Sequence, residues 1–148
     1  MCLKMKIRNA KTGDIGFLLA GLKETRDVSG FEIIEKKIDK KEYLQHIKKG
    51  LIRVVEIDNE PVAFLYFKTD AKVMYLENKF FWIDIIYVKK EYRHKRLGSI
   101  LHKDALKIAR KKGYKRIYLD IFGINKNSIK FHDKIGFKPL YSIYKKDI

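Results

Sequence analysis

The chain has 148 residues, 46% of them hydrophobic and 35% charged, a composition that fits one globular domain and excludes a disordered chain. No apolar run approaches the ~20 residues that a membrane-spanning helix needs, and Met1–Ala10 lacks the apolar core of a signal peptide, so we expect a cytoplasmic protein. The formal charge is +16, and the single cysteine, Cys2, excludes a disulfide framework and a metal site built from cysteines.

The first half of the chain predicts one strand, two helices and a hairpin. The expected elements are a strand at Leu3–Ala10, a helix from Thr12 or Asp14 to Lys23, a helix at Asp39–Lys49, and strands at Leu51–Ile57 and Val62–Phe67. Charged and apolar residues alternate in the first strand, as in an edge strand. Gly50 stops the second helix, and Asp58–Pro61 predicts the hairpin connection.

The second half predicts strands that alternate with helices. In chain order these are a strand at Phe80–Val88, a helix at Gly98–Lys112, a strand at Lys115–Phe122, a helix at Asn127–Ile135 and a final strand at Phe137–Lys145. The strand–helix–strand unit from Phe80 to Phe122 predicts a right-handed parallel crossover. The whole pattern indicates one α/β (α+β) domain, a mixed sheet with helices on both faces.

A basic turn lies between the strand at Phe80–Val88 and the helix that follows it. Its residues are Arg93, His94, Lys95, Arg96, Leu97, Gly98 and Ser99. The first N–H groups of a helix have no intrahelical partner, and the helix dipole adds positive potential at the same point. Because Gly98 has no Cβ, a ligand can approach the backbone there. We expect a phosphate, in particular a pyrophosphate, although the turn matches neither a P-loop nor the dinucleotide fingerprint.

The basic turn resembles the acetyl-CoA loop of the GNAT superfamily of N-acetyltransferases, (Q/R)-x-x-G-x-(G/A). Arg93, Arg96 and Gly98 occupy its first, fourth and sixth places. Arg96 replaces the first glycine of the family motif. Either this position needs no positive φ in this chain, or the loop is slightly remodelled.

A second motif strengthens the resemblance. Residues 125–137 follow the family's N-x-x-A-x-x-(F/L)-Y-x-K-x-G-F, with matches at Asn125, Phe131, Lys134, Gly136 and Phe137. Ser128 stands where the family usually has alanine, and His132 where it usually has tyrosine. The segment Met5–Ala10, followed by Asp14, also looks like the family's opening strand and first helix. The resemblance therefore covers essentially the whole chain, 1–148, as a single domain.

The resemblance implies a mostly antiparallel twisted sheet in which two strands splay apart and hold the pantetheine arm of acetyl-CoA between them. The residues at cofactor-binding positions are Ile86, Tyr87 and Val88 through their backbone, Arg93, His94, Lys95, Arg96, Leu97, Gly98 and Ser99 at the pyrophosphate, and Asn125, Ser128 and Lys134. No metal is expected. The segments Lys23–Lys49 and Lys68–Lys79 match the family's variable acceptor-binding region, so the acceptor amine is not named by the sequence.

The resemblance also suggests the groups that move protons. Asp84 interrupts an apolar strand at the place of the family's glutamate base, with Glu56, Asp120 and Glu77 as weaker candidates. An aspartate of ordinary pKa, ~3.9, is a weak base at neutral pH, and Asp84 would otherwise face solvent or pair with a lysine.

His132 holds the place of the tyrosine that usually protonates the CoA sulfur, and an imidazole can donate a proton. It should share a helix face with Ser128, four residues earlier. The alternatives are that water protonates the sulfur, or that Tyr87 or Tyr141 supplies a phenol.

We therefore expect an acetyl-CoA-dependent N-acetyltransferase that acts on a primary amine of a small molecule or a protein by direct attack. The alternatives are a CoA-binding regulatory protein that has lost catalysis and a basic nucleic-acid-binding module. Lysine pairs recur on every predicted element, which favours a solvated basic surface over a nucleic-acid or acidic partner. A homodimer is possible, and no membrane partner is expected.

Overall fold

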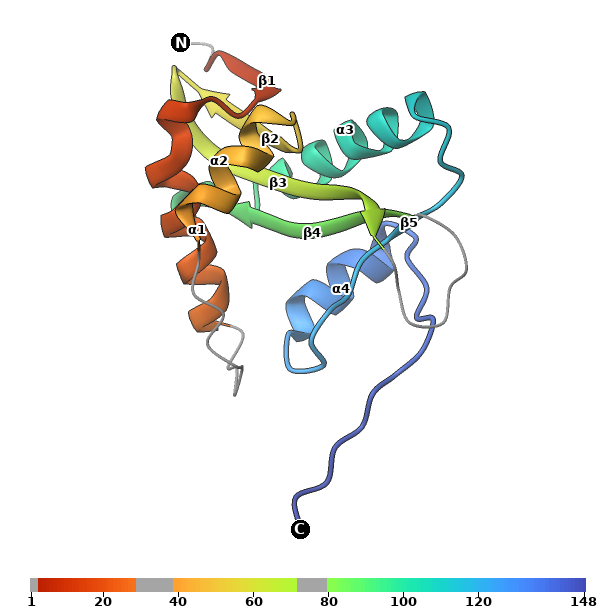
Figure 1. The fold of residues 1–148 in the computed structure, drawn as a ribbon. Coiled ribbons are helices and arrows are strands. Elements are labelled where there is room, and N and C mark those ends of the chain that lie inside the picture. The colour runs from red at the N-terminus through yellow and green to blue at the C-terminus, as the bar shows by residue number, and fades with distance from the viewer. Residues whose placement is uncertain (1–2, 29–38, 72–79) are drawn as a thin grey trace.

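The computed structural model describes residues 3–28, 39–71 and 80–148. Within them the strands form one sheet in the order β1-β2-β3-β4-β5, with β4 and β5 parallel and the other pairs antiparallel (Figure 1). The strands are β1 (Met5–Asn9), β2 (Ile52–Ile57), β3 (Glu60–Ala71), β4 (Phe80–Val88) and β5 (Ile117–Tyr118). The helices are α1 (Ile15–Val28), α2 (Lys40–Lys48), α3 (Leu97–Lys111) and α4 (Lys126–Lys134), with short 3-10 helices η1 (Thr12–Asp14) and η2 (Lys90–Tyr92). The mixed, mostly antiparallel sheet and the parallel β4–α3–β5 connection are confirmed.

The hairpin between β2 and β3 turns more tightly than the sequence predicts. Asp58 and Asn59 alone form the turn, both at positive φ, which a two-residue hairpin needs to match the twist of its strands. Pro61 belongs to β3 and lies opposite Glu56, where the register between the two strands shifts. A proline cannot donate a ladder hydrogen bond, and it is tolerated at such an irregularity.

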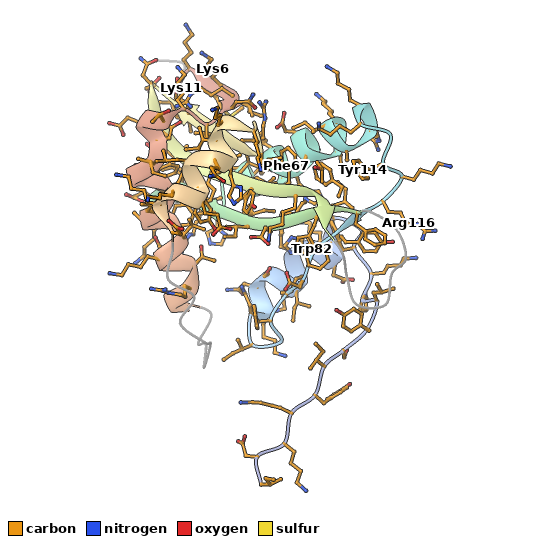
Figure 2. All side chains as sticks on the ribbon, in the orientation of Figure 1. Lys6, Lys11, Phe67, Trp82, Tyr114 and Arg116 are labelled. Carbon is orange, nitrogen blue, oxygen red and sulfur yellow. The ribbon has the colours of Figure 1, made fainter. Side chains whose placement is uncertain are left out.

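Helices cover both faces of the sheet, as predicted. Along β3, Phe64 and Tyr66 face α1 and α2, whereas Leu65 and Phe67 face α3, because successive strand side chains point to opposite faces. All four side chains are almost completely buried. Figure 2 shows Phe67 inside the molecule, in contrast to Lys6, Lys11 and Arg116 at its exposed periphery.

The predicted final strand at Phe137–Lys145 is wrong, and the strand at Lys115–Phe122 is confirmed only for the two residues of β5. The chain after α4 runs away from the sheet as an extended segment (Figure 1). Its apolar side chains, including Leu140, Ile143 and Tyr144, are exposed. An apolar sequence favours extended backbone, but a strand also needs a neighbouring edge to pair with, and two-residue β5 offers a short one.

Two residues of the basic turn, neither of them glycine, have left-handed backbone conformation. His94 has φ 61°, and Arg96 has φ 63° and ψ 14° at the N-cap of α3. The explanation that the Arg96 position needs no positive φ is therefore wrong. The turn keeps the positive φ without a glycine and carries the resulting strain.

Gly21 allows α1 to pack against the sheet. A Cβ there would lie 2.6 Å from Phe64 Cε1 and 2.7 Å from Tyr87 Cδ1. We predict that Gly21→Ala lowers the free energy of unfolding by about 1–3 kcal/mol, because two buried rings would have to shift to admit the added methyl group. Urea unfolding followed by the fluorescence of the single tryptophan, Trp82, measures the change. Gly16→Ala is the matched control in the same helix, where no atom lies within 4 Å of the added Cβ. It should leave stability unchanged or raise it by up to about 1 kcal/mol, and equal losses in both variants would contradict the packing explanation.

The strain at Arg96 is tested by comparing Arg96→Gly with Arg96→Ala. Both changes remove the same guanidinium, but only glycine relieves the left-handed backbone. Glycine stabilises the protein by relieving the strain and destabilises it through its larger unfolded-state entropy. The first effect is the larger, so Arg96→Gly should be more stable than Arg96→Ala by about 0.5–1 kcal/mol. Scanning calorimetry gives the difference. An alanine variant as stable as the glycine variant would show that the turn stores no strain at this position.

Candidate active site

β4 and β5 pair over only two residues of each strand. Trp82 is the last residue of β4 with a partner on β5, whereas the pairing of β4 with β3 continues to Val88. From residue 83 onward, the edge of β4 that faces away from β3 has no strand partner within the described part of the chain. Except for the Val88 carbonyl, which accepts from Arg93, its amide and carbonyl groups are therefore available to an extended ligand, at the place where the family resemblance expects the pantetheine arm.

Asp84 is the extra residue of a β-bulge in β4. Tyr66 and Phe67 are consecutive on β3, but their partners on β4, Ile85 and Ile83, are two residues apart. The bulge also changes which face the flanking side chains take: Ile83 packs in the core under α3, and Ile85 against the core under α1 and α2. Bulges bend a strand and redirect a side chain, which places an acidic residue in an otherwise apolar strand without burying it in either core.

A pocket of about 290 Å³ occupies the split between the two strands. It is lined by Leu22, Thr25 and Arg26 of α1, Ile83, Asp84, Ile85 and Ile86 of β4, Leu119, Asp120, Ile121 and Phe122 after β5, and Asn125, Ser128 and His132 at α4. The pocket therefore brings together six residues predicted from the sequence: Asp84, Ile86, Asp120, Asn125, Ser128 and His132. Tyr87, Val88, the basic turn and exposed Lys134 are not among its lining residues.

The basic turn presents both charges and free amides. Residues 93–96 are exposed, whereas Leu97 is buried and anchors the start of α3. The first helical hydrogen bond runs from Ile100 N–H to the Arg96 carbonyl, so the N–H groups of residues 97–99 precede it. Gly98 also lies against α4, because a Cβ there would be in van der Waals contact with Phe131, 3.4 Å from its Cζ.

Arg93 joins the basic turn to β4 and α1. Its Nε donates to the Val88 carbonyl at 3.0 Å, and its Nη2 donates to Glu24 Oε1 at 2.5 Å. The Lys89 N–H bonds to the Val62 carbonyl on β3, so across the trans peptide the Val88 carbonyl points to the split side. Arg93 therefore lies at the end of the split.

Glu24 is a site residue that the sequence did not indicate. Its other oxygen, Oε2, accepts the Tyr87 hydroxyl at 2.6 Å. The hydrogen bond from Tyr87 and the pairing with Arg93 lower the pKa of Glu24. Burial, together with this carboxylate, raises the pKa of Tyr87 to about 12. A glutamate on the polar side of a helix has no local signal that distinguishes it from a solvated one, since its two partners come from distant segments.

Two carboxylates line the pocket. Asp84 is half-buried and pairs with Lys68 Nζ at 2.9 Å, one of the outcomes that the sequence left open. Asp120 is exposed as a residue, yet partial desolvation of its carboxylate raises its pKa, and the negative charge of Asp84 adds to this effect. Of the other candidate bases, Glu56 is held by Arg8 Nε at 2.6 Å and does not line the pocket. Glu77 lies outside the described residues.

His132 and Ser128 share one face of α4, as predicted. Asn125 caps the helix by accepting the Ser128 N–H at 3.1 Å. His132 Nδ1 lies 2.8 Å from the Ser128 carbonyl oxygen and 3.2 Å from Ser128 Oγ. The His132 ring is buried, and this burial lowers its pKa. Of the two tyrosines considered in its place, Tyr87 is bound to Glu24 and Tyr141 lies in the extended C-terminal segment.

A second buried histidine, His102 of α3, packs beside His132. The ring centroids are 6.3 Å apart, and both rings contact Phe137. Burial, with His132 nearby, lowers the pKa of His102 to about 4. The sequence did not indicate His102, because it adjoins Leu101 on the apolar face of α3. Because burial lowers the pKa of both histidines, both rings are neutral at pH 7.

The structure adds two observations on other kinds of site. Within residues 3–28, 39–71 and 80–148, no group of three or more histidine, cysteine, aspartate or glutamate side chains is arranged to hold a metal ion. None of the helices in these ranges is long and apolar enough to cross a membrane.

Comparison with solved structures places this architecture among acetyltransferases. An aminoglycoside N-acetyltransferase, AAC(6')-Iy, in complex with CoA matches 100% of this chain and 97% of its own, with a TM-score of 0.75 at 13% identity. The PaiA N-acetyltransferase of Thermoplasma acidophilum in complex with coenzyme A matches 91% of this chain and 90% of its own, with a TM-score of 0.75 at 23% identity. A predicted acetyltransferase of Clostridium acetobutylicum with acetyl-CoA matches 97% and 96%, with a TM-score of 0.70 at 18% identity.

These likenesses show a shared fold. The family assignment comes from a family model, which matches the sequence itself over residues 22–137. The match begins in α1 and includes the bulged strand, the basic turn and the whole second motif. The chain belongs to the acetyltransferase (GNAT) family.

Proposed function

We propose that the protein transfers the acetyl group of acetyl-CoA to a primary amine by direct attack in a ternary complex. One observation carries the proposal: the unpaired edge of β4 runs from a basic, amide-rich turn to a pocket that holds two carboxylates. The family assignment supports it, as do the solved structures of the same fold that contain CoA or acetyl-CoA.

The basic turn suits the pyrophosphate of acetyl-CoA. The side chains of residues 93–96 supply positive charge, and the amides of residues 97–99 point outward from the start of α3. Pantetheine would lie along the unpaired edge of β4 at residues 86–88. Arg93 covers the Val88 carbonyl in this structure, so that carbonyl becomes available to pantetheine when Arg93 turns to a phosphate.

The pocket is suited to bind and deprotonate the amine. An ammonium group must lose a proton before it can attack, and the carboxylates of Asp84 and Asp120 attract the cation and can accept that proton. We assign the base role to Asp84, because the bulge turns it from both cores toward the pocket. Asp120 is the competing candidate, since it lines the same pocket and desolvation raises its pKa.

The chemical step needs no covalent enzyme intermediate. The amine nitrogen forms a bond to the thioester carbon, the carbon–sulfur bond breaks, and its electron pair leaves on sulfur. The nitrogen loses two protons between ammonium and amide: the first passes to the carboxylate before the attack, and the second passes to solvent as the amide forms. Holding the amine and the thioester together contributes most of the rate, up to about 7–11 kcal/mol in favourable cases.

The activity itself is tested by mixing the protein with acetyl-CoA and a panel of primary amines, and measuring the release of CoA thiol. We expect release that depends on both the protein and the amine. Titration calorimetry with acetyl-CoA measures binding separately. Binding without release for every amine would instead identify a CoA-binding regulatory protein, and absence of binding would refute the proposal.

The base is tested with Asp84→Asn against its matched control, Asp120→Asn. We predict that Asp84→Asn lowers kcat by roughly 10²-fold and leaves the affinity for acetyl-CoA unchanged, whereas Asp120→Asn has a much smaller effect. The loss should shrink as the pH approaches the pKa of the amine, because solution then supplies the deprotonated nucleophile. The opposite ranking of the two variants would transfer the role to Asp120.

A further inference from the structure

The donor set around the Ser128–His132 pair fixes where the hydrogens lie. A carbonyl oxygen only accepts hydrogen bonds, and the Ser128 carbonyl lies 2.8 Å from His132 Nδ1. The hydrogen of the neutral ring is therefore on Nδ1. His132 Nε2 carries the lone pair, and this atom is buried without a hydrogen-bond partner. Such a ring has no hydrogen to donate from its free nitrogen.

The same geometry determines what the serine hydroxyl does. Ser128 Oγ lies 3.2 Å from Nδ1, and a protonated Nδ1 cannot accept from it. Oγ is therefore a second acceptor of the Nδ1 hydrogen, and its own hydrogen is free to point elsewhere. This arrangement also excludes His132 as a base that would activate Ser128 as a nucleophile, because that role needs a lone pair on Nδ1.

Ser128 is placed to use this hydrogen in the pocket. It lines the pocket beside Asn125 and is only half-buried, whereas the His132 ring is 8% exposed and packs against His102 and Phe137. The Asn125 cap fixes the backbone of Ser128 from one side, and the His132 hydrogen fixes its hydroxyl from the other. A preorganised donor of this kind costs little reorganisation when charge develops near it.

We propose that the Ser128 hydroxyl donates the hydrogen bond that stabilises the departing CoA thiolate, and that His132 is a positioning residue which acts through Ser128. This inference rests on the proposed function. When the carbon–sulfur bond breaks, the electron pair stays on sulfur and accepts the Oγ–H hydrogen bond. Ser128 keeps its proton, and the thiolate leaves as such or takes a proton from solvent. The hydroxyl replaces the donor that the family usually places one turn later.

Steady-state kinetics of Ser128 variants test the proposal. Ser128→Ala should lower kcat roughly 10- to 100-fold, the range for a lost hydrogen bond to a charged group, and leave KM for acetyl-CoA within about twofold. Ser128→Thr keeps a hydroxyl and should retain most of the activity. Asn127→Ala is the matched control at an exposed neighbouring position of α4, and it should behave as wild type. Alanine is a better helix former than serine, so Ser128→Ala should fold normally.

A double variant separates positioning from independent proton donation. If His132 acts only through Ser128, Ser128→Ala with His132→Phe should be no slower than Ser128→Ala alone. A double variant slower by the product of the two single effects would overturn this and make His132 a donor in its own right. Wild-type kcat in Ser128→Ala would overturn the role of Ser128. No turnover in the wild-type protein would refute the proposed function and, with it, the departing thiolate.

The hydrogen positions are also measurable without any turnover. Long-range proton–nitrogen NMR spectra report which nitrogen of His132 carries the hydrogen. We expect a neutral ring with hydrogen on Nδ1 at pH 7, in the free protein and in the presence of CoA. Hydrogen on Nε2, or a doubly protonated ring, would overturn the inference even if Ser128→Ala were slow.

Discussion

The site depends on how β4 is held. One edge of this strand is paired with β3 along most of its length, and the other edge loses its partner after Trp82. Two residues later the strand bulges at Asp84. A bulge bends a strand and increases its twist, so the place where β4 separates from β5 is also the place where a carboxylate is directed between them. The pocket, the unpaired backbone edge and the candidate base therefore have one structural origin.

The start of α3 is stabilised by contacts that compensate for its strained turn. His94 and Arg96 are in the left-handed region, which costs roughly 1–2 kcal/mol for each such residue. Against this, Leu97 is buried in the core below α3. Arg93 is bound to the end of β4 and to Glu24 of α1. The turn consequently keeps its backbone geometry with a histidine and an arginine in the places where glycine would be less strained, and Arg96 adds positive charge next to the free amides.

The approach of α4 to α3 sets the chemistry at the other end of the pocket. Phe131 lies next to Gly98, and His102, His132 and Phe137 pack together as a cluster of rings on the same side of the pocket. Burial keeps both histidines neutral. The Ser128 carbonyl accepts a hydrogen bond from His132 Nδ1 and so determines the tautomer of that ring. The family motif presents His132 as a proton donor, but the hydrogen of its ring is directed toward the Ser128 carbonyl. The Ser128 hydroxyl is left to face the pocket.

Elements that depend on local pattern could be predicted from the amino-acid sequence. β4 has the predicted bounds, α2 begins one residue after the predicted start at Asp39, and α4 begins one residue before the predicted start at Asn127. The basic turn was recognisable because a strand, a cluster of cations and a helix start are adjacent in the chain. Asp84, Ser128 and His132 were found because each interrupts a pattern, either the apolar run of a strand or the family motif.

Contacts between distant residues, in contrast, could be read only from the folded chain. The Glu24–Arg93 pair joins positions 69 residues apart, and no periodicity encodes such a contact. The bulge at Asp84 depends on the register with β3, and the expected C-terminal strand did not form because extended backbone needs a partner edge. The tautomer of His132 depends on a single carbonyl. Local sequence sets propensity and polarity, but register, pairing and the direction of a hydrogen are set by neighbours that the chain brings together only when it folds.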